Sequence, residues 1–137
     1  MIHALGRLLT VGALSGTVAI AGIGTASAKS SIDFHAAPRT QHVGQWFNVN
    51  GSGRADVSGW ERFCVQERYN ARGAWSTVWC GRISDSTRQD ASAYGRVRAG
   101  HAAVLELRGV LEGVQHAWGG RTWLDAESAP VRVNIVH

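Results

Sequence analysis

The chain has 137 residues, 45% of them hydrophobic and 18% charged, and its formal net charge is +4. The basic residues are spread along the sequence and do not form the dense stripe that nucleic-acid binding requires, so we expect no nucleic-acid partner. Two cysteines without a neighbouring histidine pair do not make a closed zinc site, and we expect neither a metal nor a cofactor.

Residues 1–28 have the parts of a secretory signal peptide. Arg7 is the only firm charge of a short basic region, residues 8–23 are uncharged, and the segment ends in Ala-Ser-Ala at positions 26–28. The alternative is a retained membrane anchor, since about 20 apolar residues can cross a bilayer. Several glycines in the segment and the lack of a basic cluster after it favour cleavage. The sequence therefore predicts a secreted, extracellular protein with no membrane contact after cleavage.

Removal of residues 1–28 leaves 109 residues, enough for one domain with its own hydrophobic core. Residues 29–41 include Pro38 and are expected to be a flexible leader. Over residues 42–137 the pattern changes to short runs of alternating apolar and polar residues, which is the period of a β-strand. The first good strand covers residues 43–50, with Phe47 and Val49 on one face.

The stretch 60–82 is predicted to be a β-hairpin with turn residues at 70–73, where Gly73 is free to take a positive φ. If residues whose numbers sum to 144 face each other, Cys64 opposes Cys80 and Val65 opposes Trp79. Directly opposed Cβ atoms are close enough for a disulfide. Closing a loop of about 15 residues stabilises a fold by about 3 kcal/mol in the chain-entropy model. The same register places Trp79 on the face of Val65, which should be the core.

Later strands are predicted over residues 93–98, 103–111 and 131–136. Their apolar or small residues alternate with polar ones, so one face of each strand should point to the core. Glycines interrupt residues 112–122, where we expect a long loop with at most a short strand. Six or seven strands at this spacing predict an all-β fold, an antiparallel β-sandwich.

Several runs resemble bacterial secreted immunoglobulin-like or fibronectin-III-like domains. They are Val-Gly-Gln at 43–45, Trp-Ser-Thr-Val-Trp-Cys at 75–80 and Ser-Ala-Pro-Val-Arg-Val at 128–133. The likeness covers most of residues 42–136 and implies an immunoglobulin-like sandwich. It says little about function, because such domains serve as spacers, adhesins and binding modules. A Cys64–Cys80 bridge would staple one hairpin, whereas the antibody bridge joins two sheets, so antigen-type recognition is not carried over.

Enzyme motifs are missing from the sequence: it has no G-x-S-x-G elbow, H-E-x-x-H motif or P-loop. Asp125 and Glu127 could act as a carboxylate pair, and His101 and His116 with Asp125 could imitate a triad or metal site. Carboxylate pairs two residues apart are common on solvated strand faces, and no short spacing supports the histidine arrangement, so surface positions are the simpler interpretation. We expect no enzymatic activity and no catalytic residue.

Tryptophan is the least ordinary feature, because six residues exceed what one small core requires. An exposed Trp beside Arg or Asn can stack on a sugar ring or anchor a protein partner. The candidate binding residues are Trp46, Trp60, Trp75, Trp118, Trp123 and Arg121. The alternative is that these rings only cover the disulfide and the sheet edges.

The predicted function is that of a secreted, monomeric, non-enzymatic binding module for an extracellular protein or glycan. One alternative is a carbohydrate- or cell-wall-binding module that uses exposed Trp. A small extracellular enzyme, an enzyme inhibitor and a ligand carrier are further alternatives.

Overall fold

The computed structural model describes residues 30–137, and the expected signal peptide lies outside the described residues. Regular structure in this range consists of β-strands. The strands are β1 (Ser30–Ala36), β2 (Thr40–His42), β3 (Trp46–Ala55), β4 (Trp60–Tyr69), β5 (Ser76–Cys80), β6 (Ser84–Asp85), β7 (Ala91–Arg98), β8 (Ala103–His116), β9 (Gly119–Glu127) and β10 (Val131–Val136). Between residues 30 and 137 there is no helix long and apolar enough to span a membrane.

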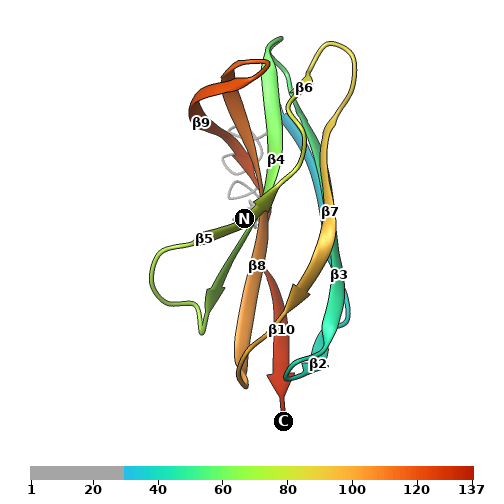
Figure 1. Cartoon of the computed structure of the whole chain (residues 1–137), viewed down its shortest axis with the longest axis vertical. Coiled ribbons are helices and arrows are strands. Elements are labelled where there is room, and N and C mark those ends of the chain that lie inside the picture. Colours follow the sequence, from blue (N-terminus) through green and yellow to red (C-terminus); the bar gives the residue numbers. More distant parts are fainter. Residues whose placement is uncertain (1–29) are drawn as a thin grey trace, which may run out of the picture.

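Two sheets lie face to face along the long axis of the molecule (Figure 1). The three-stranded sheet has the order β1-β3-β7. The seven-stranded sheet has the order β2-β10-β8-β4-β5, with β6 paired to β4 and β9 paired to β8. Neighbouring strands are antiparallel except β2, which runs parallel to β10. The result is an all-β sandwich with a strand order similar to that of immunoglobulin-like domains.

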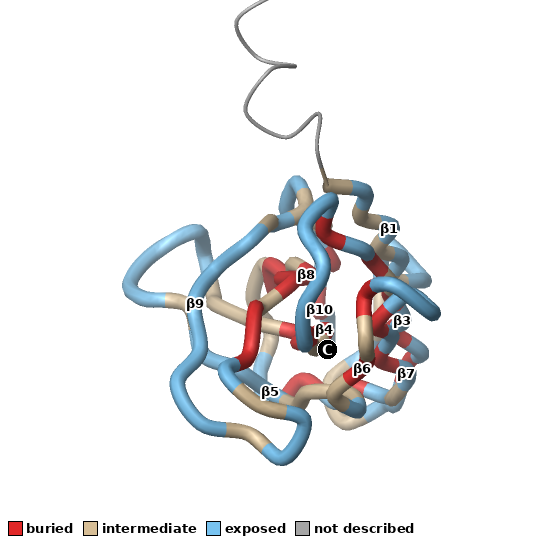
Figure 2. Tube along the Cα trace, turned by 90° about the horizontal axis from the view of Figure 1, so that it is seen from above, coloured by how far each residue is buried: buried red, intermediate tan, exposed pale blue. Residues whose placement is uncertain are grey.

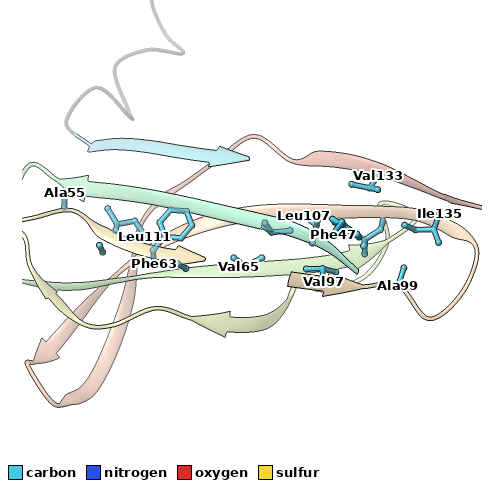
Figure 3. Packing of buried hydrophobic residues seen from close by; sticks show 14 residues of the cluster. Phe47, Ala55, Phe63, Val65, Val97, Ala99, Leu107, Leu111, Val133 and Ile135 are labelled. Atoms are coloured by element: carbon cyan, nitrogen blue, oxygen red, sulfur yellow. The ribbon is translucent and has the colours of Figure 1, made fainter. Parts of the chain in front are cut away.

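Apolar side chains of both sheets fill the space between them (Figure 3), and the exposed residues lie on the outside (Figure 2). The inner face of β7 carries Ala91, Ala93, Gly95 and Val97, which are small or short side chains. The seven-stranded sheet supplies larger ones, among them Phe63, Leu105, Leu107 and Leu111. Large groups of one sheet therefore fill the space left by small groups of the other, as close interior packing requires.

The Phe63 ring shows this complementarity at one position. A Cβ atom added at Gly51 of β3 would lie 2.3 Å from the ring, and one added at Gly109 of β8 would lie 2.2 Å from it. Both distances are shorter than any tolerable contact, so only glycine fits on either side of Phe63. The lack of a side chain at Gly109 therefore makes room for the Phe63 ring.

The β4–β5 hairpin has the predicted register at its disulfide end. Cys64 pairs with Cys80 and Val65 pairs with Trp79, and the two cysteines form a disulfide with their Cα atoms 4.0 Å apart. Beyond Val65 the register shifts by one residue, so the predicted pairing ends there. Gly73 has the expected positive φ of 74°.

The expected flexible leader over residues 29–41 is wrong for the part that the structure describes. Residues Ser30–Ala36 form β1, which pairs with β3, and Thr40–His42 form β2. Ile32 and Phe34 alternate with polar residues and pack against the core, and the Phe34 ring lies 6.4 Å from that of Phe63. Burial of these side chains fixes the segment in the three-stranded sheet.

The expected long loop over residues 112–122 is also wrong. β8 continues to His116 and β9 begins at Gly119, so the two strands form an extended hairpin. Ala117 and Trp118 form its tight turn, and Gly119 and Gly120 at the start of β9 have positive φ values of 120° and 101°. Together with β1, β2 and β6, this hairpin raises the number of strands in the described range above the six or seven expected.

Candidate binding surfaces

The outer face of the three-stranded sheet carries an exposed group of aromatic, amide and guanidinium side chains. Alternation along β3 and β7 points these residues away from the core, and the β3–β7 register joins them into rows. Trp46 is opposite Arg98, Asn48 is opposite Arg96, and Asn50 is opposite Tyr94. We call these six residues the open face. Trp46 is 54% exposed and Tyr94 is 72% exposed.

The two arginines of the open face lie beside an aromatic ring. The guanidinium carbon of Arg96 is 5.4 Å from the centroid of the Trp46 ring, and that of Arg98 is 5.9 Å from it. Within the described chain, no carboxylate oxygen lies within 4.0 Å of either guanidinium group. A cation–π contact leaves the N–H groups at the edge of a guanidinium free to donate. The open face therefore presents two charged donors with no acidic partner.

The outer face of the seven-stranded sheet has the same residue types in a closed arrangement. Trp75, from the β4–β5 connection, contacts Arg68 and Arg108, whose guanidinium carbons are 4.3 and 4.4 Å from its ring centroid. Arg68 Nε donates to Glu106 Oε1 at 3.0 Å, and a terminal nitrogen of Arg108 donates to Glu127 Oε2 at 2.7 Å. We call these five residues the paired face. Their contacts indicate that Trp75 stabilises the fold.

Trp60 lies at the edge of a shallow depression beside β6. The depression has a volume of about 580 Å³, and Asp85, Arg88 and Gln89 help to line it. Asp85 already accepts two hydrogen bonds from Thr87, one from its backbone N–H and one from its hydroxyl group, and these bonds lower the pKa of Asp85. The ring of Trp60 is partly exposed at this end of the sheet.

The tip of the β8–β9 hairpin carries Trp118, the most exposed of the tryptophans at 82%. Its ring stacks on that of His116, with centroids 4.6 Å apart and planes 12° apart. Arg121 is exposed nearby, and its backbone N–H donates to Gln115 Oε1 at 3.2 Å.

Trp123 lies in β9, and its ring covers the neighbouring strand β8. A Cβ atom added at Gly113 would lie 2.1 Å from its Nε1 atom, so the ring lies across that glycine.

Glu61, opposite Gly113 on β4, is only 1% exposed, and its Oε2 atom accepts the backbone N–H of Ala55 at 3.0 Å. Burial raises the pKa of Glu61, the Ala55 hydrogen bond lowers it, and the negative charge of Asp125 raises it further. Burial also raises the pKa of Asp125, against a hydrogen bond from the Trp123 side chain that lowers it.

The acidic and histidine residues considered for chemistry do not converge. Glu127 is bound to Arg108, whereas the charge of Asp125 acts on Glu61, so the two carboxylates do not form a pair. His101 stacks on Tyr69 at one end of β8, and His116 lies at the other end. Between residues 30 and 137, the only ligand-bearing side chains close enough to share one metal ion are Cys64, Cys80 and Glu112, and the disulfide occupies both thiols.

The tryptophans predicted as binding residues do not form one surface. Trp46 lies on the three-stranded sheet, and Trp75 lies on the paired face. Trp60, Trp118 and Trp123 occupy separate positions near the β8–β9 hairpin. The other members of the open face were not predicted as site residues. These are Asn48, Asn50, Tyr94, Arg96 and Arg98. Alternation places all five on polar strand faces, but only the pairing of β3 with β7 brings them to Trp46.

No family model matches the sequence, and no curated protein matches it. Solved structures with a similar fold include a superoxide reductase (neelaredoxin) from Ignicoccus hospitalis, with a TM-score of 0.49 and 10% identity over 82% of this chain and 87% of that chain. An ICAM-5 D1–D4 ectodomain fragment has a TM-score of 0.43 and 18% identity, over 77% of this chain and 27% of that chain. A β-glucosidase from Listeria innocua has a TM-score of 0.37 and 9% identity, over 77% of this chain and 16% of that chain. At these identities the likeness concerns the fold alone.

Proposed function

We propose that the chain is a secreted, non-enzymatic, monomeric immunoglobulin-like domain that binds an extracellular partner through the open face. The observation that carries this proposal is the contrast between its two outer faces. Trp46 and Tyr94 are exposed beside arginines that have no acidic partner in the described chain, whereas the arginines of the paired face are bound to carboxylates. Exposed aromatic and Arg residues are the types that dominate binding energy in protein interfaces.

The immunoglobulin-like assignment is supported by the strand order. In such sandwiches the A, B and E strands share one sheet, and the G, F, C and C′ strands share the other. The orders β1-β3-β7 and β10-β8-β4-β5 follow the same pattern, with β2 added in parallel to β10. β9, which pairs with the C-terminal part of β8, is then an insertion between the F and G strands.

Secretion is supported by the N-terminal sequence and by the disulfide, which persists in oxidising compartments. We expect the protein in the culture medium to begin at Lys29, and intact-mass measurement of that protein would test this. A chain that keeps residues 1–28 and stays with the membrane would contradict it.

The binding proposal is tested with fluorescently labelled protein and intact cells of the producing species. We expect saturable binding that a Trp46→Ala/Arg96→Gln/Arg98→Gln variant loses. The matched control is Trp60→Ala/Arg82→Gln/Arg88→Gln, which removes the same residue types from other exposed or partly exposed sites. Equal binding by both variants, or no saturable binding by the wild type, would refute a role for the open face.

A further inference from the structure

The outer face of the three-stranded sheet has an uneven distribution of charge along its strands. At one end, Arg54 and Asp90 form an ion pair of 2.8 Å, and Asp33 lies opposite Ser52. Toward the other end come the rows of the open face, whose charged residues are Arg96 and Arg98. This half of the sheet therefore has a positive potential, which favours an anionic partner.

The two arginines have a fixed spacing and orientation. They are two residues apart on β7 and point to the same side, which separates their Cα atoms by about 6.6–6.8 Å. Trp46 lies beside both guanidinium groups and limits their freedom. A guanidinium fork binds a carboxylate, sulfate or phosphate group with two parallel hydrogen bonds. A partner with repeated anionic groups would match this pair better than a single small anion.

The aromatic residues of the open face are arranged for separate contacts. Trp46 and Tyr94 lie in the first and the last of the three rows, and Asn48 and Arg96 form the row between them. Polar side chains separate the two aromatic residues, so the open face lacks the continuous apolar centre of a protein–protein interface. Aromatic faces that stack on sugar rings, amides that bind hydroxyl groups and arginines that bind acidic groups instead suit a polysaccharide.

We propose that the open face binds an anionic polysaccharide that lies along β3 and β7, an inference that rests on the proposed binding function. Arg96 and Arg98 bind its acidic groups, Trp46 and Tyr94 stack on its sugar rings, and Asn48 and Asn50 bind its hydroxyl groups. The charge complementarity selects an acidic polymer over a neutral one.

The test is affinity electrophoresis of the secreted chain at about 0.15 M salt, where exposed charges more than about 8 Å apart are largely screened. The probes are polygalacturonate, dextran sulfate, neutral dextran and poly-L-glutamate. We expect binding to polygalacturonate or dextran sulfate, and comparison of these two identifies the acidic group. Arg96→Gln/Arg98→Gln should weaken binding at least about tenfold, as expected for the loss of charged hydrogen bonds.

Two controls separate specific binding from general attraction to a basic protein. Arg82→Gln/Arg88→Gln removes the same charge from other exposed positions and should change the affinity by less than about twofold. Trp46→Ala keeps the charge and should weaken binding about tenfold, because stacking is lost. Thermal unfolding of each variant confirms that it is folded.

Stronger binding to poly-L-glutamate than to either acidic polysaccharide would overturn the inference in favour of an acidic protein partner. Equal binding to neutral dextran would overturn the role of charge. If no polysaccharide binds while labelled protein still binds cells through Trp46, Arg96 and Arg98, the inference fails and the proposed function stands. If cell binding is also absent, both fail.

Discussion

The two outer faces of this sandwich use the same residue types in different ways. On the paired face, Trp75 contacts both Arg68 and Arg108, and each arginine also binds a carboxylate. On the open face, Trp46 is more than half exposed, and its two arginines have no carboxylate within 4.0 Å in the described chain. The presence of Trp and Arg therefore does not distinguish a stabilising cluster from a binding site. The two are distinguished by whether acidic residues on neighbouring strands bind the arginines.

The register explains why the arginines of the paired face have acidic partners and those of the open face have none in the described chain. On the seven-stranded sheet, Arg68 of β4 lies opposite Glu106 of β8, and Arg62 lies opposite Glu112. On the three-stranded sheet, Arg96 lies opposite Asn48 and Arg98 lies opposite Trp46. Directly opposed opposite charges stabilise a sheet, whereas an Arg–Asn pair leaves the charge free for another molecule.

The largest difference between the faces should come from the disulfide, which only the seven-stranded sheet has. Cys64→Ala/Cys80→Ala should lower the free energy of unfolding by about 3 kcal/mol, because the unfolded chain regains the freedom of a loop of about 15 residues. Urea unfolding of the variant and of the wild type would measure this. A loss below about 1 kcal/mol would show that the hairpin is held by its strand pairing alone.

The next largest difference should be between the contributions that the ion pairs of the two sheets make to the free energy of unfolding. Glu106 is 2% exposed and binds Arg68, so Glu106→Gln should cost about 1–3 kcal/mol. Asp90 and Arg54 are about half exposed, and Asp90→Asn should change the stability by less than about 1 kcal/mol. Urea unfolding of both variants gives the comparison. Equal losses would contradict the distinction between a structural and a solvated pair.

Replacement of one tryptophan on each face should give a smaller difference in stability. Trp75→Ala loses two cation–π contacts of about 0.5–1 kcal/mol each and should lower the stability by about 1–2 kcal/mol. Trp46→Ala removes a more exposed ring whose two cation–π contacts are longer, at 5.4 and 5.9 Å, and should cost less than about 1 kcal/mol. Thermal unfolding would measure both. A larger loss for Trp46 than for Trp75 would reverse the assignment of the faces.

Local patterns in the sequence were sufficient to predict the strands with strong alternation. Phe47 and Val49 are buried on one face of β3, and Leu105 and Leu107 on one face of β8, because a period of two is visible within a few residues. The Cys64–Cys80 register followed from the spacing within one hairpin.

Features that depend on distant partners could not be predicted in this way. Ile32 and Phe34 show a short alternation, but the strand that they form is fixed only by its pairing with β3. Gly113 suggested a loop, yet it lies under the ring of Trp123. The open face requires the pairing of Trp46 with Arg98, which are far apart in the sequence. Residue type alone therefore predicted both Trp75 and Trp46 as binding residues. Of these two, Trp75 is covered by contacts with arginines, and Trp46 is more than half exposed.

The smallest effect concerns Glu61, which joins the two sheets at one end through its bond to Ala55 of β3. Because burial raises the pKa of Glu61, the folded protein binds more protons than the unfolded chain above the ordinary glutamate pKa. Its contribution to stability should thus fall as the pH rises from about 4 toward 7. Glu61→Gln keeps an oxygen acceptor for Ala55 without the charge, so its stability should fall less over this range. Thermal unfolding at both pH values, with Asp56→Asn as an exposed control, tests this, and parallel pH profiles for wild type and Glu61→Gln would contradict it.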